Sequence, residues 1–267
     1  MTELRGSRVL VTGANGGLGR AIAIALRAEG AELVVTGRRA GPLEAVAAEV
    51  QGTAILADLA DRAQVGRLLA EAGDVDVLVA NAALPGSGDL GEWGQDQIDR
   101  VLEVNLGSPI AMTRALLPRF RARGSGHFVY VSSLSGKVAS KGASLYSATK
   151  FGLRGFAGGL RADLHRGGTA TGIGVSIVFP AFVRGAGMFA DSGATLPLGI
   201  GTVSPKEVAD AVVRAIHTDK AEITVAPLPL RLGAFLGAIA PGASAAVQAR
   251  FGTRLAEELI AAQRGKR

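Results

Sequence analysis

The sequence predicts an α/β fold, a single domain whose doubly wound parallel sheet of about seven strands has helices on both faces. Short apolar runs, such as residues 8–12 and 32–36, have the composition of parallel strands buried on both sides. Helical patterns such as Leu18, Ile22 and Leu26 alternate with these runs, as in βαβ units. The 267 residues are enough for one large domain with a substantial core.

The remaining elements follow the same alternation along the chain. We expect strands at residues 8–12, 32–36, 53–57, 76–80, 126–132, 175–179 and 222–225. We expect helices after the first strand and at residues 42–50, from about 61, 95–121, 145–166 and from 205. Ser204 caps the last of these helices and Pro205 is its first residue. Pro109 interrupts the long helix 95–121, because proline removes a backbone donor.

A glycine-rich loop, residues 12–19, lies between the first strand and its helix. Its glycines allow a tight turn and let the backbone approach a pyrophosphate, while the helix N-terminus offers free N–H groups and a partial positive charge. Such turns also occur without ligands. The position between a strand and an amphipathic helix favours a Rossmann-type nucleotide site.

The end of the second strand indicates which dinucleotide binds. NAD enzymes of this type place a carboxylate here for the ribose hydroxyls, but the sequence has Gly37 followed by Arg38 and Arg39. Arginine pairs with a 2′-phosphate and stacks on adenine. We therefore expect NADP(H) to be preferred, with NAD(H) possible, unless the two arginines only begin a solvated loop.

Tyr146 and Lys150 are four residues apart on a predicted helix and so lie on one face. An ammonium group beside a phenol favours the phenolate, which makes the tyrosine a better proton donor near neutral pH. The same spacing is also common on solvated helices. Three further stretches, the glycine loop, residues 81–83 and residues 132–133, favour the catalytic interpretation.

Together these stretches resemble the classical short-chain dehydrogenase/reductase family over roughly residues 6 to 225. The family's T-G-x-x-x-G-x-G is matched by Thr12, Gly13, Gly17 and Gly19, and Ser133 lies 13 residues before Tyr146. Asn81-Ala82-Ala83 is similar to the family's N-N-A-G, with departures at Ala80 and Leu84.

The resemblance implies roles for the catalytic candidates Asn105, Ser133, Tyr146 and Lys150. Tyr146 would exchange a proton with the substrate oxygen that Ser133 orients, although Ser132 and Ser135 compete for that role. Lys150 would bind the ribose and lower the pKa of Tyr146, and Asn105 would hold a water of a proton relay. The implied cofactor-binding residues are Thr12, Gly13, Asn15, Gly17, Leu18, Gly19, Arg38, Arg39, Asp58, Asn81, Ala82, Tyr146, Lys150, Pro180 and Val183.

Some of these positions depart from the family pattern or have a second interpretation. Asp58 would contact the adenine amino group, or it could cap the helix that begins near Asp61. After Pro180, Ala181 replaces a glycine and Gly185 replaces a threonine that usually contacts the nicotinamide carboxamide. Without the threonine, backbone atoms of Val183 could make that contact instead. Otherwise the loss of the contact weakens cofactor binding.

The C-terminal third adds a lid and an extension to the core, residues 1–225. Residues 185–203 are mostly apolar and are the expected substrate lid, which suggests an apolar substrate. In the extension, residues 226–267, an uncharged stretch from 232 to 247 is too short to span a bilayer and is broken by Pro241. It covers the site, joins a subunit interface or lies on a membrane surface, and we favour the first two.

Composition excludes several other classes of function. The absence of cysteine rules out disulfides and thiol catalysis, and three widely separated histidines argue against a metal site. The net charge is +6, but scattered basic residues and only 4% aromatics argue against nucleic acid. The N-terminus shows no signal peptide, so we expect a cytoplasmic protein.

Glycines at 152, 155, 158 and 159 interrupt the helix that carries Tyr146. They lower helix stability but allow another helix to approach closely. The resemblance implies a homodimer or homotetramer through this face, while close packing on the chain's own sheet is the alternative.

The sequence as a whole therefore predicts an NADP(H)-dependent oxidoreductase that interconverts a carbonyl compound and an alcohol, acting on CH–OH donors. The alternative is a non-catalytic NADP(H)-sensing regulator on the same fold, which leaves the serine, tyrosine and lysine without a purpose.

Overall fold

The structure, a computed structural model, describes residues 2–165, 172–190, 201–242, 246 and 260. Its centre is a seven-stranded parallel sheet in the order β3-β2-β1-β4-β5-β6-β7, which confirms the predicted doubly wound fold. The strands are β1 Arg8–Thr12, β2 Glu32–Gly37, β3 Thr53–Leu56, β4 Val77–Ala80, β5 Gly126–Val131, β6 Ile173–Pro180 and β7 Glu222–Val225.

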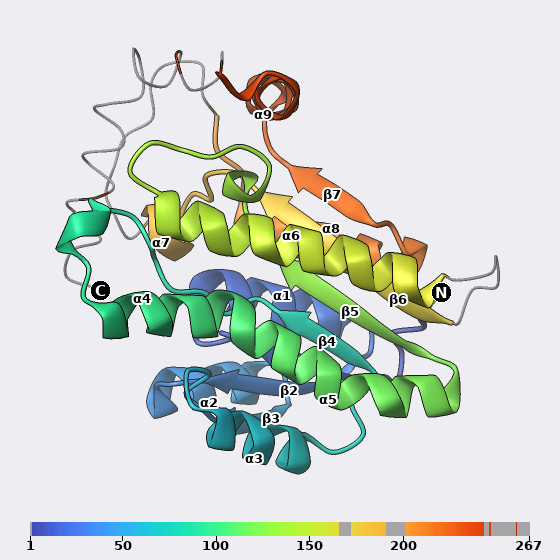
Figure 1. The fold of residues 1–267 in the computed structure, drawn as a ribbon. Helices are drawn as coiled ribbons and strands as arrows, with labels where there is room; N and C mark the ends of the chain where they lie inside the picture. The colour runs from blue at the N-terminus through green and yellow to red at the C-terminus, as the bar shows by residue number, and fades with distance from the viewer. Residues whose placement is uncertain (1, 166–171, 191–200, 243–245, 247–259, 261–267) are drawn as a thin grey trace.

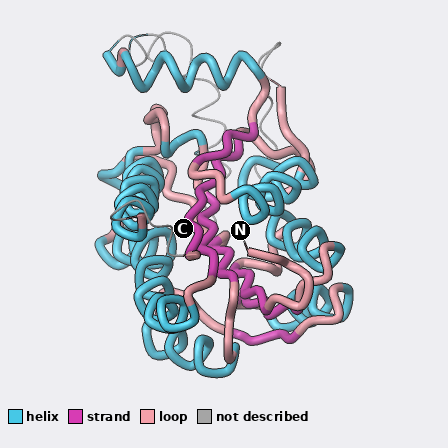
Figure 2. The backbone as a smooth tube through the Cα atoms, turned by 90° about the vertical axis from the view of Figure 1, so that its right-hand side faces the viewer, coloured by secondary structure: helices cyan, strands magenta, loops and turns pink. Residues whose placement is uncertain are grey.

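Helices cover both faces of this sheet (Figures 1 and 2). They are α1 Gly17–Ala28, α2 Ala40–Glu49, α3 Arg62–Ala72, α4 Gln95–Leu102, α5 Ser108–Arg123, α6 Ser144–Leu164, α7 Gly187–Ala190, α8 Pro205–Thr218 and α9 Leu228–Ile239. Helices α1, α2 and α8 contribute to one buried cluster, whereas α3, α5 and α6 contribute to another.

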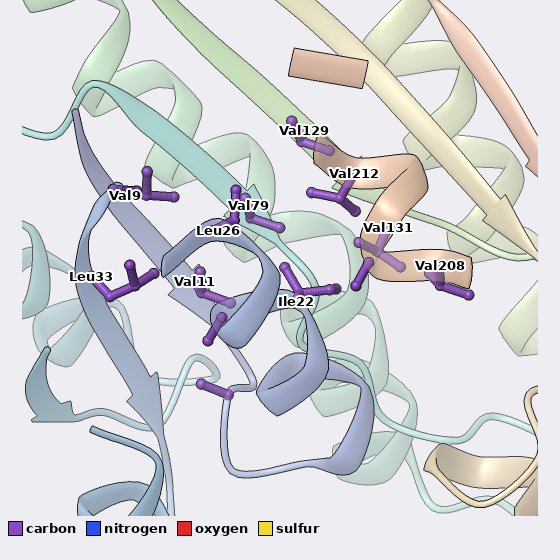
Figure 3. Close-up of a cluster of buried hydrophobic side chains, with 14 of the residues drawn as sticks. Val9, Val11, Ile22, Leu26, Leu33, Val79, Val129, Val131, Val208 and Val212 are labelled. Carbon is purple, nitrogen blue, oxygen red and sulfur yellow. The ribbon is translucent and has the colours of Figure 1, made fainter. Parts of the chain in front are cut away.

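Alternation along the strands explains the two clusters. Val9 and Val11 of β1 belong to the cluster with α1 and α8, while Leu10 between them belongs to the other. Successive strand side chains point to opposite faces, so a continuous apolar run supplies both cores. Figure 3 shows the first of these cores, where Ile22 of α1 and Val212 of α8 face the strand residues.

The long helix expected at 95–121 is divided into three segments. Between α4 and α5 lies a π-helical segment, Glu103–Gly107, and Pro109 stands in the first turn of α5. Proline cannot donate to the preceding turn, so the backbone before it adopts wider hydrogen bonding. The expectation of one helix is corrected, but the position of the interruption was predicted from Pro109.

The capping prediction for α8 is confirmed. The Ser204 side chain accepts a hydrogen bond from the Glu207 backbone N–H, and the Glu207 carboxylate accepts one from the Ser204 N–H at 2.7 Å. This reciprocal arrangement satisfies two donors that the first turn of a helix leaves free.

The chain order reverses direction across the sheet between β1 and β4. β1 pairs with β2 on one side and with β4 on the other. Loops that leave these two strands diverge to opposite faces, so a crevice is left beyond their carboxyl ends, where ligands bind in open α/β sheets.

Two C-terminal segments border this end of the sheet. The lid expected at 185–203 is described at both ends, where α7 follows Gly185 and Val203 forms a parallel bridge with Val183. Its residues 191–200 lie outside the described residues. Helix α9 follows β7 and crosses beyond the sheet edge at the top of Figures 1 and 2. Among the described residues, no helix is long and apolar enough to cross a membrane.

Candidate active site

A cavity of about 1060 Å³ lies at the carboxyl ends of the strands. Its walls come from segments far apart in the sequence: the glycine loop, the ends of β2, β3 and β4, the loop after β5, the start of α6, residues 180–189 and helix α9. The topology therefore gathers most of the predicted site residues around one cavity.

The glycine loop turns closely against the end of β4. Gly13 has φ +67°, and a Cβ there would lie 2.8 Å from the Ala82 Cα. The Thr12 hydroxyl accepts hydrogen bonds from the backbone N–H groups of Asn81 and Ala82, both at 3.0 Å. The Asn81 amide donates to the Thr12 carbonyl at 2.9 Å. Thr12 is thus buried behind the cavity wall and fixes the loop, whereas Asn81 and Ala82 line the cavity.

The N-terminus of α1 faces the cavity without a side-chain cap. Its N-cap, Gly16, has an extended backbone and makes no side-chain cap hydrogen bond, and the first turn holds no acidic residue. Gly17, Leu18 and Gly19 line the cavity. Backbone N–H groups and the positive end of the helix dipole suit a phosphate. This observation fits the pyrophosphate of the predicted dinucleotide.

The Asn15 side chain packs against Gly37, where any larger residue would place its Cβ. A Cβ at Gly37 would lie 2.7 Å from the Asn15 amide, so a carboxylate-bearing side chain there would displace it. Arg38 and Asn15 line the cavity. Arg39 instead donates to the Asn15 carbonyl at 3.3 Å and precedes α2 as its N-cap. Only the first of the two arginines therefore borders the expected adenosine position.

Asp58 borders the same part of the cavity, but its carboxylate is engaged. It accepts from the Ala60 N–H at 3.0 Å and pairs with Arg100 of α4 at 2.6 Å. The alternative role as a helix cap is wrong, because Asp61 caps α3 through the backbone N–H groups of Ala63 and Gln64. Arg100 itself was not predicted, since nothing in its sequence surroundings distinguishes it from other surface arginines.

Tyr146 and Ser133 meet at the cavity wall. Their side chains share a hydrogen bond, and both residues line the cavity. Ser133 also accepts from the Ser135 N–H at 3.2 Å, whereas the neighbouring Ser132 hydroxyl donates to the Lys150 carbonyl at 3.3 Å. Of the three serines considered, Ser133 is the one whose hydroxyl bonds Tyr146.

Lys150 lies behind Tyr146, one helical turn further along α6. Its Nζ atom is 5.6 Å from the centroid of the Tyr146 ring and donates to the Val131 carbonyl at 3.0 Å. The side chain is buried and does not line the cavity. Burial lowers its pKa from 10.5 to about 8.

The lowering of the Tyr146 pKa by Lys150, which the resemblance implies, stays a prediction. Burial raises the pKa of Tyr146 to about 12 and outweighs the opposing effect of the hydrogen bond with Ser133. The Lys150 ammonium donates to a backbone carbonyl and not to the phenol. Tyr146 is therefore a phenol at neutral pH, which is the state that can donate a proton.

Asn105 is the buried residue at the centre of the π-helical segment. Its amide oxygen accepts from the Leu84 N–H at 2.7 Å, and its amide nitrogen donates to the Leu84 carbonyl at 2.9 Å and to the Thr149 hydroxyl at 3.3 Å. These bonds tie the loop after β4 to the helix of Tyr146. The relay role implied by the resemblance stays a prediction.

The segment after β6 explains one departure from the family pattern. Pro180 and Val183 line the cavity, and Gly185 has φ +71°. A threonine at that φ would be strained, because β-branched side chains avoid the left-handed region. The replacement of threonine by glycine therefore matches this backbone, which carries Ala186 to within contact of the glycine loop at Gly17.

Helix α9 lines the cavity. The sequence predicted that the C-terminal extension could cover the site, but not which of its residues do so. Leu230, Gly233, Ala234 and Gly237 form part of the wall. Their spacing of three and four places them on one helical face. Phe182, Met188 and Phe189 add further apolar wall from the residues around α7.

Comparison with known proteins now decides the family. A profile described as short chain dehydrogenase matches residues 7–196. The chain belongs to the short-chain dehydrogenase family. It is 36% identical to ketoacyl reductase HetN of Nostoc over 239 residues, which is 86% of this chain and 82% of that protein. It is 32% identical to dehydrogenase/reductase SDR family member 7B of Mus musculus, over 90% of this chain and 79% of that protein.

Solved structures of the family agree in fold. A short-chain dehydrogenase from Sphingobium yanoikuyae in complex with NADPH superposes with a TM-score of 0.75 at 27% identity, over 89% of this chain and 95% of that chain. A putative β-ketoacyl-ACP reductase gives a TM-score of 0.74 at 29% identity, over 84% of this chain and 98% of that chain. The chain is thus an oxidoreductase by family.

Proposed function

We propose that the protein reduces a carbonyl group on an apolar molecule to an alcohol with NADPH, and catalyses the reverse oxidation. The observation that carries the proposal is the hydrogen-bonded pair Tyr146 and Ser133 on the wall of a cavity that also contains the glycine loop. The pair shares this cavity with the N-terminus of α1, which supports a proton donor acting beside a bound dinucleotide.

The side chains divide the chemistry between them. Bound NADPH would supply the hydride that reaches the carbonyl carbon. Ser133 would orient and polarise the carbonyl oxygen through its hydroxyl. Tyr146 would give its phenolic proton to that oxygen as the C–O π electrons move onto it, so that an alcohol leaves. Lys150 lies behind Tyr146 with its ammonium on the Val131 carbonyl, so it would have to turn toward the cavity to bind the ribose hydroxyls.

The preference for NADPH rests on the adenosine end of the cavity. Arg38 lines it, Asn15 fills the space beside Gly37, and no carboxylate side chain follows β2. A guanidinium attracts a 2′-phosphate, whereas NAD binding of this type relies on a carboxylate. The NADPH complex of the Sphingobium relative is in keeping with this preference.

The proposal of an apolar substrate rests on the apolar residues that line the cavity away from the glycine loop. Phe182, Met188 and Phe189 lie on one side, and Leu230 and Ala234 of α9 lie on another. Such walls favour the burial of hydrocarbon, at about 25 cal/mol for each Å² removed from water. The HetN relative is named a ketoacyl reductase, which makes 3-oxoacyl compounds a natural class to test here.

NADPH oxidation across aldehydes, ketones and 3-oxoacyl thioesters of increasing chain length tests the proposal. We expect turnover that rises with chain length and falls by a factor of about 10² to 10⁴ in Tyr146→Phe, as for loss of a general acid. NADPH binding, followed by fluorescence, should be retained in the variant.

Two outcomes would contradict this account. Turnover in Tyr146→Phe near that of the wild type would remove the tyrosine from the mechanism. NADPH binding without turnover of any carbonyl or of the corresponding alcohols with NADP⁺ would favour the non-catalytic sensor.

A further inference from the structure

One face of helix α9 is apolar and exposed. Within Leu228–Ile239 the only ionisable side chain is Arg231. The exposed apolar residues Leu228, Leu232, Phe235, Leu236 and Ile239 are between 54% and 67% exposed. At about 100° per residue they fall within an arc of about 100°. The other exposed large apolar residues in the described part of the chain, such as Ile24 and Leu90, are spread over different elements.

The opposite face of α9 belongs to the catalytic cavity. Leu230, Gly233, Ala234 and Gly237 line it, and Ala234 and Gly237 are buried. Leu236 also lines the cavity but is 63% exposed, so it lies at the boundary between the two faces. The helix is therefore a single-layer wall between the cavity and its own exposed apolar face. In Figure 2 it lies across the top of the molecule, outside the helices that cover the two faces of the sheet.

Positive charge is concentrated in the same part of the sequence. Residues 228–267 contain six Lys and Arg but only two Glu, so they carry +4 of the net charge of +6. An apolar helix face with cations nearby in the chain matches the interface of an anionic lipid layer, where each cation near the surface contributes about 1 kcal/mol.

A second copy of the chain fits this face less well. A helix of 12 residues is about 18 Å long and 10 Å wide, so one face offers far less than the roughly 800 Å² that each partner buries in a stable complex. A spanning arrangement is excluded for α9 by its length.

We propose that α9 binds the surface of an anionic bilayer through Leu228, Leu232, Phe235, Leu236 and Ile239. Because the inner face of the same helix lines the cavity, the substrate is a membrane-dissolved carbonyl compound with a long apolar chain. The proposal that α9 binds a bilayer is independent of the enzyme's activity. The route of the substrate rests on the proposed function.

Sedimentation with vesicles tests the binding. Full-length protein is mixed with vesicles of phosphatidylcholine, alone or with phosphatidylglycerol. Wild type should sediment with the anionic vesicles and be released by high salt. The double variant Leu232→Gln with Phe235→Gln should partition at least tenfold less, because two apolar side chains leave the lipid. The matched control, Ile24→Gln with Leu90→Gln, should sediment like the wild type.

The results separate this proposal from its rivals. Equal sedimentation of wild type and the α9 variant, or none of the wild type, overturns it. A lower mass of the α9 variant in light scattering without vesicles, together with unchanged sedimentation, identifies a subunit contact instead. Circular dichroism and reduction of a short water-soluble ketone establish that the variant is folded.

The substrate route has its own readout. Anionic vesicles should raise kcat/KM for a long-chain ketone in wild type and not in the α9 variant, and should leave a short ketone unaffected. A protein that binds vesicles but reduces no carbonyl retains the binding proposal and loses the proposed function. A protein that reduces carbonyls but binds no vesicles retains the proposed function and loses the binding proposal.

Discussion

On α6, Tyr146 is half-buried at the cavity wall and Lys150 is buried behind it, and the loss of solvent shifts the pKa of each toward its neutral form. The tyrosine is held as a phenol, with its pKa raised to about 12. The lysine remains charged at pH 7 but with its pKa lowered to about 8. In the proposed mechanism the tyrosine would therefore carry its proton at neutral pH, while the lysine would lose its charge in mildly alkaline solution.

The Lys150 pKa predicts how stability depends on pH. Its folded pKa of about 8 lies below the unfolded value of 10.5, so the unfolded chain binds more protons between these values. The lysine's penalty on folding is full below pH 8 and fades as pH rises toward 10.5. From pH 8 to 10 the free energy of unfolding should gain about 2 kcal/mol relative to Lys150→Met. Parallel pH profiles of the two proteins in urea unfolding would contradict the assignment.

Arg38 and Arg39 are adjacent but face different surroundings, which gives a matched pair of variants. Arg38 lines the cavity, whereas Arg39 donates to the Asn15 carbonyl. We expect Arg38→Ala to weaken NADPH binding at least tenfold and to leave NADH binding nearly unchanged, because only NADPH carries the 2′-phosphate. Arg39→Ala should have a smaller effect on NADPH. Equal losses for both cofactors in Arg38→Ala, measured by fluorescence titration, would refute this role.

At the scale of elements, the sequence determined most of what depends on local pattern. β1, the glycine loop and α1 were predicted because an apolar run, glycines and a 3.6-residue period follow each other directly. The division of helix 95–121 was foreseen at Pro109, but the π-helical segment was not. Its geometry depends on Asn105 bonding the Leu84 backbone 21 residues earlier, and no local pattern contains that contact.

Asn105 should accordingly matter for stability. Asn105→Ala leaves the part-buried N–H and carbonyl groups of Leu84 without these partners, so we expect a loss of roughly 2 kcal/mol in the free energy of unfolding. Gln95→Ala, which removes an exposed side-chain bond to Asp99, should cost under about 0.5 kcal/mol. Urea unfolding of both variants checks this. Similar small losses would show that the Asn105 bonds do not stabilise the fold.

On the scale of the whole molecule, the cavity could be predicted only in part. The sequence placed the glycine loop, Ser133 and Tyr146 at the carboxyl ends of strands, and parallel topology brings those ends together. The contribution of α9 and of Arg100 depends on packing between segments more than 40 residues apart, which periodicity does not encode. The cytoplasmic location stays a prediction.

The oligomeric state also stays a prediction, and the structure makes it testable. Gly155, Gly158 and Gly159 of α6 face open space: a Cβ at each would meet nothing within 4 Å. Close packing on the chain's own sheet therefore does not explain them. Gly158→Glu should lower the mass measured by light scattering to that of a smaller assembly. Gly66→Glu on α3, equally open, should leave it unchanged. An unchanged mass in Gly158→Glu would place the subunit contact elsewhere.

The central claim is that Tyr146 protonates a carbonyl oxygen as hydride arrives at its carbon. Single-turnover reduction of a long-chain ketone with NADPH deuterated at the transferred position tests it most directly. The account predicts an alcohol with deuterium on the former carbonyl carbon, formed at least a hundredfold more slowly by Tyr146→Phe at saturating cofactor. Equal rates in the two proteins, or an alcohol without deuterium, would contradict it.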